Sequence, residues 1–81
     1  MEKTELLDLL AEVAGTDEVR TNPDLDLFGT QVIDSMRVVE LIVGLDERFG
    51  LVVSPADLDR DHWATPAQWV ADIQARAAIT A

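Results

Sequence analysis

The stretch Ser35–Phe49 reads SMRVVELIVGLDERF and decides the fold. At about 100° per residue, one side of a helix over this stretch carries the apolar residues Val38, Leu41, Ile42, Leu45 and Phe49. This spacing predicts an amphipathic helix that packs on a core and ends at Gly50. The opposite side groups Met36, Glu40, Val43 and Glu47. Two apolar residues therefore stand among acids, where a surface facing water is expected.

Further helices are predicted on both sides of this one. The segment Thr4–Ala14 is expected to be an amphipathic helix ended by Gly15, with an apolar side made by Leu6, Leu7, Leu10, Val13 and Ala14. Thr65-Pro66-Ala67-Gln68 has the form of a capping box and predicts a helix to about Ala78, with an apolar side made by Trp69, Val70, Ile73 and Ala77. Ser54-Pro55-Ala56-Asp57 combines a capping residue with a proline at the first helical position, which predicts a short helix.

The segment Thr16–Ile33 contains Pro23, Gly29 and clustered acids, and its apolar residues follow no sustained period. It is therefore expected to be a long loop, pinned to the core by Leu25, Leu27, Phe28, Val32 and Ile33. Loops of this length in a compact domain are uncommon and tend to be functional. Because no segment alternates like a strand, the sequence predicts one all-α domain over residues 1–81: a four-helix bundle of three long helices and one short helix.

Composition limits the classes of function. A chain of 81 residues leaves little room for a deep enzyme cleft, and a net charge of -10 disfavours binding to nucleic acid or anionic membranes. The absence of cysteine rules out a thiol of the chain itself. The sequence has neither a signal peptide nor a membrane span, so we expect a cytoplasmic protein without membrane insertion, monomeric when free. Its partners are expected to present basic patches.

Asp34-Ser35-Met36 lies where the long loop meets the central helix. Serine is among the best residues for capping a helix N-terminus, and an acid there favours the positive end of the helix dipole. By position alone, Ser35 is a helix cap. No histidine is near it in sequence to act as a general base, so a chemical role for its hydroxyl would require a separate modifying enzyme.

The stretch Asp24–Phe49, DLDLFGTQVIDSMRVVELIVGLDERF, resembles the carrier protein family of fatty acid, polyketide and peptide synthesis. Those carriers typically have D-S-L where this chain has Asp34-Ser35-Met36. Met36 in place of leucine is similar to the stand-alone D-alanyl carrier branch, and so is Leu58–Pro66, LDRDHWATP. The resemblance implies an acyl-carrier-like bundle in which Ser35, flanked by Asp34, receives 4'-phosphopantetheine from coenzyme A. It implies a carrier, not an enzyme, that holds acyl or aminoacyl cargo as a thioester.

The implied partners are a phosphopantetheinyl transferase, an adenylating ligase, and an acyltransferase or synthase with a basic docking patch. They must approach the start of the central helix to reach Ser35. The candidate docking face is therefore Met36, Arg37, Glu40, Val43 and Glu47, with Asp46 nearby. The plain alternative is an ordinary solvated helix surface with isolated apolar residues.

Two pathways fit such a carrier. One is D-alanine delivery to teichoic acid, which the similarity of Leu58–Pro66 favours. The other is natural-product biosynthesis of polyketides or peptides. Five of the six basic residues are arginine, which hints at a GC-rich genome and gives the natural-product pathway a slight preference. A third reading, from a different class, is an acidic adaptor domain in which Ser35 only caps the helix.

The remaining candidate residues are expected to have structural roles. His62 is the only histidine and is expected to lie on a surface loop, while Trp63 and Trp69 are expected in the core. The segment beginning at Asp24 starts like a calcium-binding EF-hand loop, but Phe28 and Ser35 stand where oxygen ligands are required. The alternating acids Asp57, Asp59 and Asp61 also lack the loop glycine, so no metal site is predicted.

Overall fold

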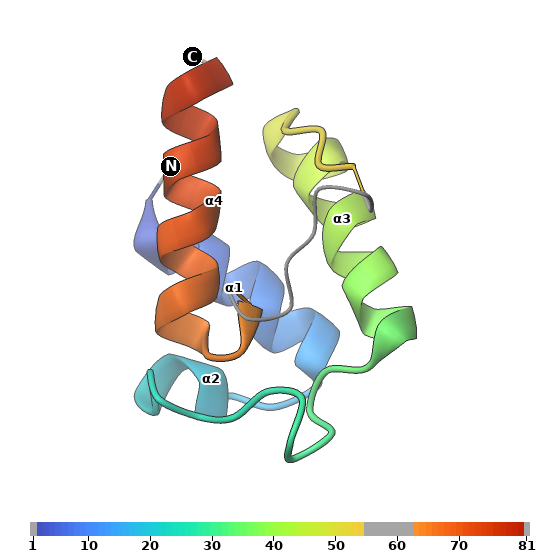
Figure 1. The fold of residues 1–81 in the computed structure, drawn as a ribbon, viewed down its shortest axis with the longest axis vertical. Helices are drawn as coiled ribbons and strands as arrows, with labels where there is room; N and C mark the ends of the chain where they lie inside the picture. The colour runs from blue at the N-terminus through green and yellow to red at the C-terminus, as the bar shows by residue number, and fades with distance from the viewer. Residues whose placement is uncertain (1, 55–62, 81) are drawn as a thin grey trace.

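The computed structural model describes residues 2–54 and 63–80. Within them the chain forms helices and no strand, which confirms the predicted all-α fold. The helices are α1 (Lys3–Ala14), α2 (Glu18–Thr21), α3 (Ser35–Phe49) and α4 (Pro66–Thr80). Figure 1 shows α3 and α4 on opposite sides of the bundle, with α1 passing diagonally from one side to the other.

Helix α1 is the centre of the bundle, because it contacts α2, α3 and α4. Its buried residues are Leu6, Leu9, Leu10, Ala11 and Ala14. The sequence placed Leu7 and Val13 on the core side and omitted Leu9, yet Leu7 and Val13 are only partly buried while Leu9 is buried. A single apolar stripe assumes one packing partner, whereas α1 has partners around much of its circumference.

The predicted core side of α3 is confirmed. Val38, Leu41 and Leu45 are buried, and Ile42 and Phe49 pack against the core at its edge. Gly50 ends the helix in the left-handed conformation, with φ at 66°, which glycine adopts at little cost. Gly15 ends α1 in the same way, with φ at 74°.

The start of α4 lies against the two tryptophans. The amide of Gln68 donates to Thr65 Oγ1 at 3.2 Å, so Thr65 is the capping residue that the sequence predicted. Trp63 and Trp69 are buried and meet edge to face, with ring centroids 6.1 Å apart, which confirms their place in the core. The indole Nε1 of Trp63 donates to Asp72 Oδ2 at 2.8 Å.

A short helix that the sequence did not predict lies inside the expected long loop. Helix α2 covers only Glu18–Thr21, and its one buried residue is Val19. The amide of Glu18 donates to Thr16 Oγ1 at 3.2 Å at its start. One turn is too short to show a helical period, so no sequence pattern could have revealed it. The short helix predicted after Ser54, together with His62 and the alternating acids, lies outside the described residues.

The rest of the loop is pinned to the core, as predicted. Leu25, Leu27 and Ile33 are buried. The amide of Leu27 donates to the carbonyl of Ala64 at 2.8 Å, and the amide of Ala67 to that of Pro23 at 3.2 Å. These bonds hold the loop against the start of α4, and Figure 1 shows the N-terminal ends of α3 and α4, α2 and the loop at the same end of the bundle.

Candidate functional site

Ser35 is the first residue of α3 and is exposed. The preceding residue, Asp34, has an extended backbone and caps the helix, because its Oδ1 accepts a hydrogen bond from the amide of Arg37 at 2.9 Å. The backbone carbonyl of Asp34 accepts the next amide, that of Val38, also at 2.9 Å. The sequence suggested Ser35 as the residue that caps α3, but the structure shows that the capping residue is Asp34.

Because Asp34 caps the helix, the fold does not use the side chain of Ser35 as a cap. Within residues 2–54 and 63–80, its hydroxyl makes no hydrogen bond. An exposed hydroxyl that stabilises nothing can be esterified without breaking a contact of the fold. Serine at this position is therefore available to a modifying enzyme.

The surroundings of Ser35 suit a phosphodiester. A 15-residue helix begins at this residue, and its dipole favours negative charge at this end. The amides of Ser35 and Met36 make no hydrogen bond with any part of the chain that the structure describes, so they are free to donate to phosphate oxygens. The exposed position of the hydroxyl leaves room for a long substituent pointing away from the bundle.

Arg37 differs from the other candidate docking residues. Its guanidinium turns back from α3 and donates through Nη1 to the carbonyl of Val13, in the last turn of α1. Arginine near a helix C-terminus satisfies a carbonyl that has no partner within the helix and opposes the negative end of the dipole. Arg37 thus ties the first turn of α3, next to Ser35, to the end of α1.

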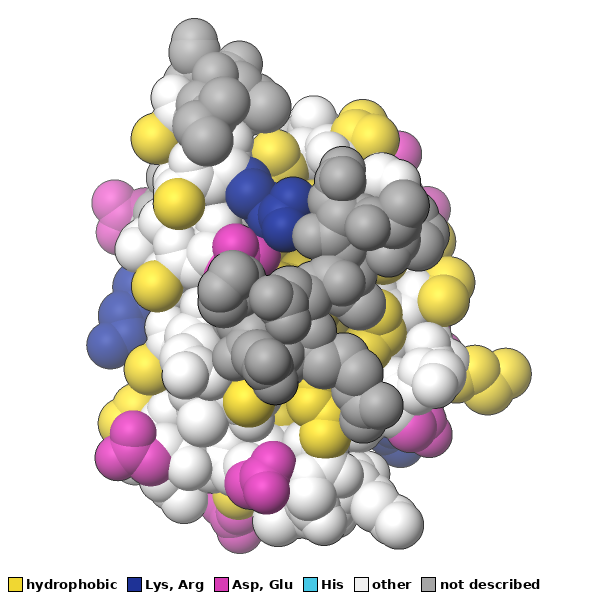
Figure 2. All heavy atoms as spheres, viewed as in Figure 1, with side chains coloured by type: hydrophobic (Ala, Val, Ile, Leu, Met, Phe, Trp, Pro, Cys, Tyr) yellow, Lys and Arg dark blue, Asp and Glu magenta, His cyan; other side chains and the backbone are white. Residues whose placement is uncertain are grey.

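Helix α3 exposes more apolar surface than the sequence suggested. Met36 is 76% exposed and Val43 is 47% exposed, as expected for candidate docking residues. Val39, which the sequence analysis left out, is 55% exposed. Its spacing of three residues from Met36 and four from Val43 places it beside both, and that spacing was the signal that could have identified it. Figure 2 shows hydrophobic side chains reaching the surface along the α3 side of the molecule.

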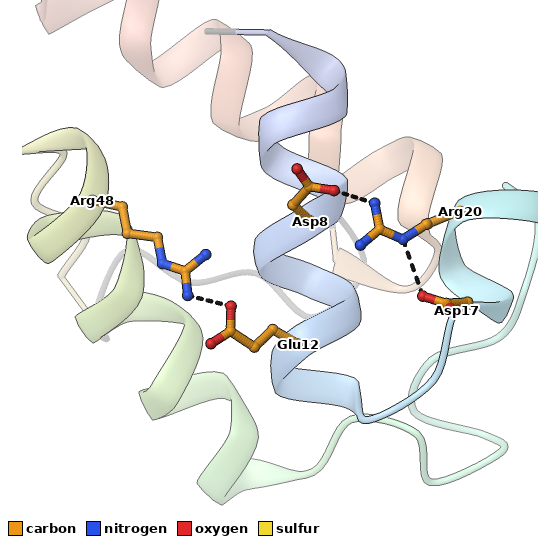
Figure 3. Close-up of polar contacts among 5 residues, drawn as sticks. All are labelled: Asp8, Glu12, Asp17, Arg20 and Arg48. Carbon is orange, nitrogen blue, oxygen red and sulfur yellow. Dashed lines mark hydrogen bonds and ion pairs between the residues drawn. The ribbon is translucent and has the colours of Figure 1, made fainter.

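The acids of this surface have no cationic partner in the part of the chain that the structure describes. Within residues 2–54 and 63–80, Glu40, Asp46 and Glu47 form no ion pair. The described arginines are engaged elsewhere: Arg20 pairs with Asp8 and Asp17, Arg48 with Glu12 (Figure 3), Arg76 with Asp72, and Arg37 with a carbonyl. The outer face of α3 therefore combines exposed apolar side chains with uncompensated negative charge.

The described residues give no sign of a metal site or a membrane segment. Over residues 2–54 and 63–80, no three His, Cys, Asp or Glu side chains are grouped so that they could hold a metal ion. In the same part of the chain, no helix combines the length and the apolar character needed to cross a bilayer.

Comparison with known proteins agrees with this geometry. Residues 4–73 match the family described as "Phosphopantetheine attachment site". The chain is 47% identical over 64 residues to the D-alanyl carrier protein of Bacillus velezensis, an overlap of 79% of this chain and 82% of the relative. It is 40% identical over 72 residues to the D-alanyl carrier protein of Lacticaseibacillus casei, covering 89% of each chain.

A third relative, the D-alanyl carrier protein of Bacillus subtilis strain 168, is 44% identical over 64 residues, which cover 79% of this chain and 82% of that protein. The family match spans most of the chain, and the alignments cover 82% or 89% of each relative. The protein belongs to the family of carrier proteins that bear 4'-phosphopantetheine.

Proposed function

We propose that this protein is a D-alanyl carrier in which Ser35 bears the phosphopantetheine group and the outer face of α3 docks the partner enzymes. The observation that carries the proposal is the pairing of Asp34 with the amide of Arg37, which leaves the Ser35 hydroxyl exposed and without a partner among the described residues, at the start of a long helix. When bound, the group supplies a thiol that holds the cargo as a thioester, a function that a chain without cysteine does not have by itself.

The residues of the chain position the group and do not activate it. Asp34 caps the first turn of α3, which fixes the position and direction of the Ser35 side chain on the bundle. The dipole of α3 favours the charge of the phosphodiester, and Arg37 holds this end of the helix against α1. Proton transfer during attachment and loading is assigned to the partner enzymes, because no hydrogen bond joins the Ser35 hydroxyl to a base among the described residues.

The D-alanyl cargo is preferred to natural-product biosynthesis on the strength of the relatives. The relatives reported above are D-alanyl carrier proteins and align along most of their length. The preference for arginine that favoured the biosynthetic pathway reflects the composition of a genome and not the chemistry of a site. We therefore revise the earlier preference and take D-alanine as the cargo, with teichoic acid as the final acceptor that the family resemblance implies.

Attachment is tested by incubating the protein with coenzyme A and a broad-specificity phosphopantetheinyl transferase and measuring the intact mass. We expect a gain of one phosphopantetheine in the wild type and none in Ser35→Ala. Ser54→Ala, which changes the only other serine of the chain, is the matched control and should be modified like the wild type. Modification of Ser35→Ala, or no modification of the wild type, would overturn Ser35 as the attachment residue.

The cargo is tested separately, with protein that already carries the group. A ligase that adenylates D-alanine and serves a D-alanyl carrier protein is supplied with ATP and either D-alanine or L-alanine. We expect a mass increase of one alanyl residue with D-alanine only, reversed by hydroxylamine, which cleaves thioesters. Efficient loading by a ligase of polyketide or peptide assembly, with none by the D-alanine ligase, would instead favour the biosynthetic pathway.

A further inference from the structure

A groove of about 320 Å³ lies between α1 and α3, beside the candidate docking face. Its apolar walls are Leu9 and Val13 from α1, and Val39 and Val43 from α3. Gly44 lies at the contact of the two helices, where a Cβ atom would stand only 2.7 Å from Leu9 Cδ1. The glycine therefore lets α1 come close to α3, and the groove has side chains of both helices as its walls.

The charge around this groove is unbalanced. Its lining contains the carboxylates of Glu12, Glu40 and Glu47 and a single guanidinium, that of Arg48. Arg48 is already paired with Glu12 across the two helices (Figure 3). Glu40 and Glu47 have no ion pair among the described residues, so the rim has an excess of negative charge.

We propose that this groove between α1 and α3 receives an apolar side chain of the adenylating ligase, flanked in the ligase by lysine or arginine. The inference rests on the proposed carrier function and adds to it a second wall from α1 and the chemistry of the partner. An apolar anchor in a pocket gives affinity, while complementary charge at the rim gives orientation and rate of encounter.

The position of the groove suits a docking site that serves Ser35. Val43 is eight residues beyond Ser35, which corresponds to about 12 Å along the axis of α3. A ligase anchored at this distance contacts the carrier without covering the hydroxyl at the helix start. The serine is then presented in a fixed direction, because α3 is a continuous helix from Ser35 to Phe49.

The charges favour this occupant over the alternatives. A second copy of the chain would bring its own acidic rim against Glu40 and Glu47, and like charges in close contact oppose association. An anionic small molecule would be repelled in the same way. A basic and apolar segment satisfies both the walls and the rim.

The α3 wall is tested by placing a charge in the groove. We expect Val43→Asp, loaded with phosphopantetheine, to lower the kcat/KM of D-alanine loading by about tenfold, as expected for loss of an interface anchor. Val52→Asp is the matched control, because Val52 is a valine that is 77% exposed and does not line the groove. It should stay within about twofold of the wild type. Circular dichroism checks that both variants keep their helical content.

A test of the α1 wall distinguishes docking in the groove from docking on α3 alone. Because the chain has no cysteine, Val13→Cys can be alkylated selectively with N-ethylmaleimide before the phosphopantetheine group is attached. The alkylated side chain should fill the groove and lower the kcat/KM of loading by about tenfold. Glu5→Cys, an exposed position of α1 away from the groove, is alkylated in the same way as control and should load normally.

The rim is tested with Glu47→Lys, which should raise the KM of the carrier by about fivefold at low salt and less at high salt. Glu18→Lys, on α2, is the matched control. Normal loading of alkylated Val13→Cys would overturn the groove as a docking site, whatever Val43→Asp does, while leaving the carrier function intact. Failure of the D-alanine ligase to load the wild type would overturn the proposed cargo, and this inference with it.

Discussion

The α1–α2 surface and the outer face of α3 are both acidic, but they use their charges differently. On the first, Arg20 of α2 contacts Asp8 of α1 and Asp17 at the start of α2 (Figure 3). These hydrogen bonds, that with Asp8 first, raise the pKa of the Arg20 guanidinium above its usual value. On the second, Glu40 and Glu47 have no ion pair among the described residues.

The difference separates charge that serves the fold from charge that is available to a partner. The short helix α2 has one buried residue, Val19, and its Arg20 pairs with Asp8 of α1. Helix α3 is held by its buried side, and its outer acids contribute nothing to that packing. The net charge of -10 belongs to the whole chain and does not distinguish the two surfaces, whereas their contacts do.

The largest change in stability is expected at the contact that fixes α3 to α1. In Gly44→Val, the new side chain would collide with Leu9, which is buried and has little room to move. Overpacking of this kind costs about 1–3 kcal/mol, of which a better helix propensity recovers a part. We expect a loss of about 1–2 kcal/mol in the free energy of unfolding, measured by urea titration.

Ala75→Val, at an exposed position of α4, is the control for this substitution. It should cost no more than about 0.7 kcal/mol, the difference in helix propensity. If Gly44→Val proved as stable as the control, the close contact between α1 and α3 would be refuted, and the α3 surface would not depend on α1.

The next effect distinguishes the two residues at the start of α3. Asp34→Ala removes the helix cap and should lower the free energy of unfolding by about 1 kcal/mol. Ser35→Ala removes a hydroxyl that has no partner among the described residues, and it should change the free energy of unfolding by less than about 0.5 kcal/mol. The free energies of unfolding are compared by urea titration of the unmodified proteins. Equal losses in the two variants would mean that the Ser35 hydroxyl also stabilises the fold.

A smaller effect is expected on the α1–α2 surface. Arg20→Gln removes the contacts with Asp8 and Asp17 and should lower the thermal midpoint by less than Asp34→Ala does. Because these pairs are exposed, the loss should shrink when the salt concentration rises. Thermal unfolding at low and high salt measures both. A loss that did not depend on salt would indicate that Arg20 acts through packing and not through charge.

The smallest effect is expected on the outer face of α3. The double substitution Glu40→Gln and Glu47→Gln removes two charges that have no ion pair among the described residues, from a strongly negative chain. Stability should stay within about 0.5 kcal/mol of the wild type, with any change toward a gain, because repulsion falls. A clear loss of stability would show that these acids serve the fold and would remove the contrast between the two surfaces.

The long helices were predictable because each has enough residues to show its period. Ser35–Phe49 was given correctly to the residue, and its buried side was identified from spacing alone. Capping residues marked the start of α4, and Gly15 and Gly50 marked the ends of α1 and α3. Helix α2 was not predicted, because its four residues are too few to show a helical period.

At the candidate site, sequence reasoning located Ser35 and most of the exposed side of α3. It also placed Arg37 among the docking residues, which stays a prediction; the contact of its guanidinium with the carbonyl of Val13 in α1 could not be read from the sequence. It omitted Val39, although its spacing from Met36 and Val43 places it beside both; only the structure showed that this valine is also a wall of the groove with α1.

The sequence by itself determined the all-α class, the three long helices, the acidic character and the serine at a helix start, because these follow from local spacing and residue type. Only the tertiary structure decided which acids keep a free charge, that Asp34 and not Ser35 caps α3, and that α1 and α3 share a groove. The physical reason is that pairing, capping and burial are relations between side chains, and a side chain has no fixed partners until the helices pack.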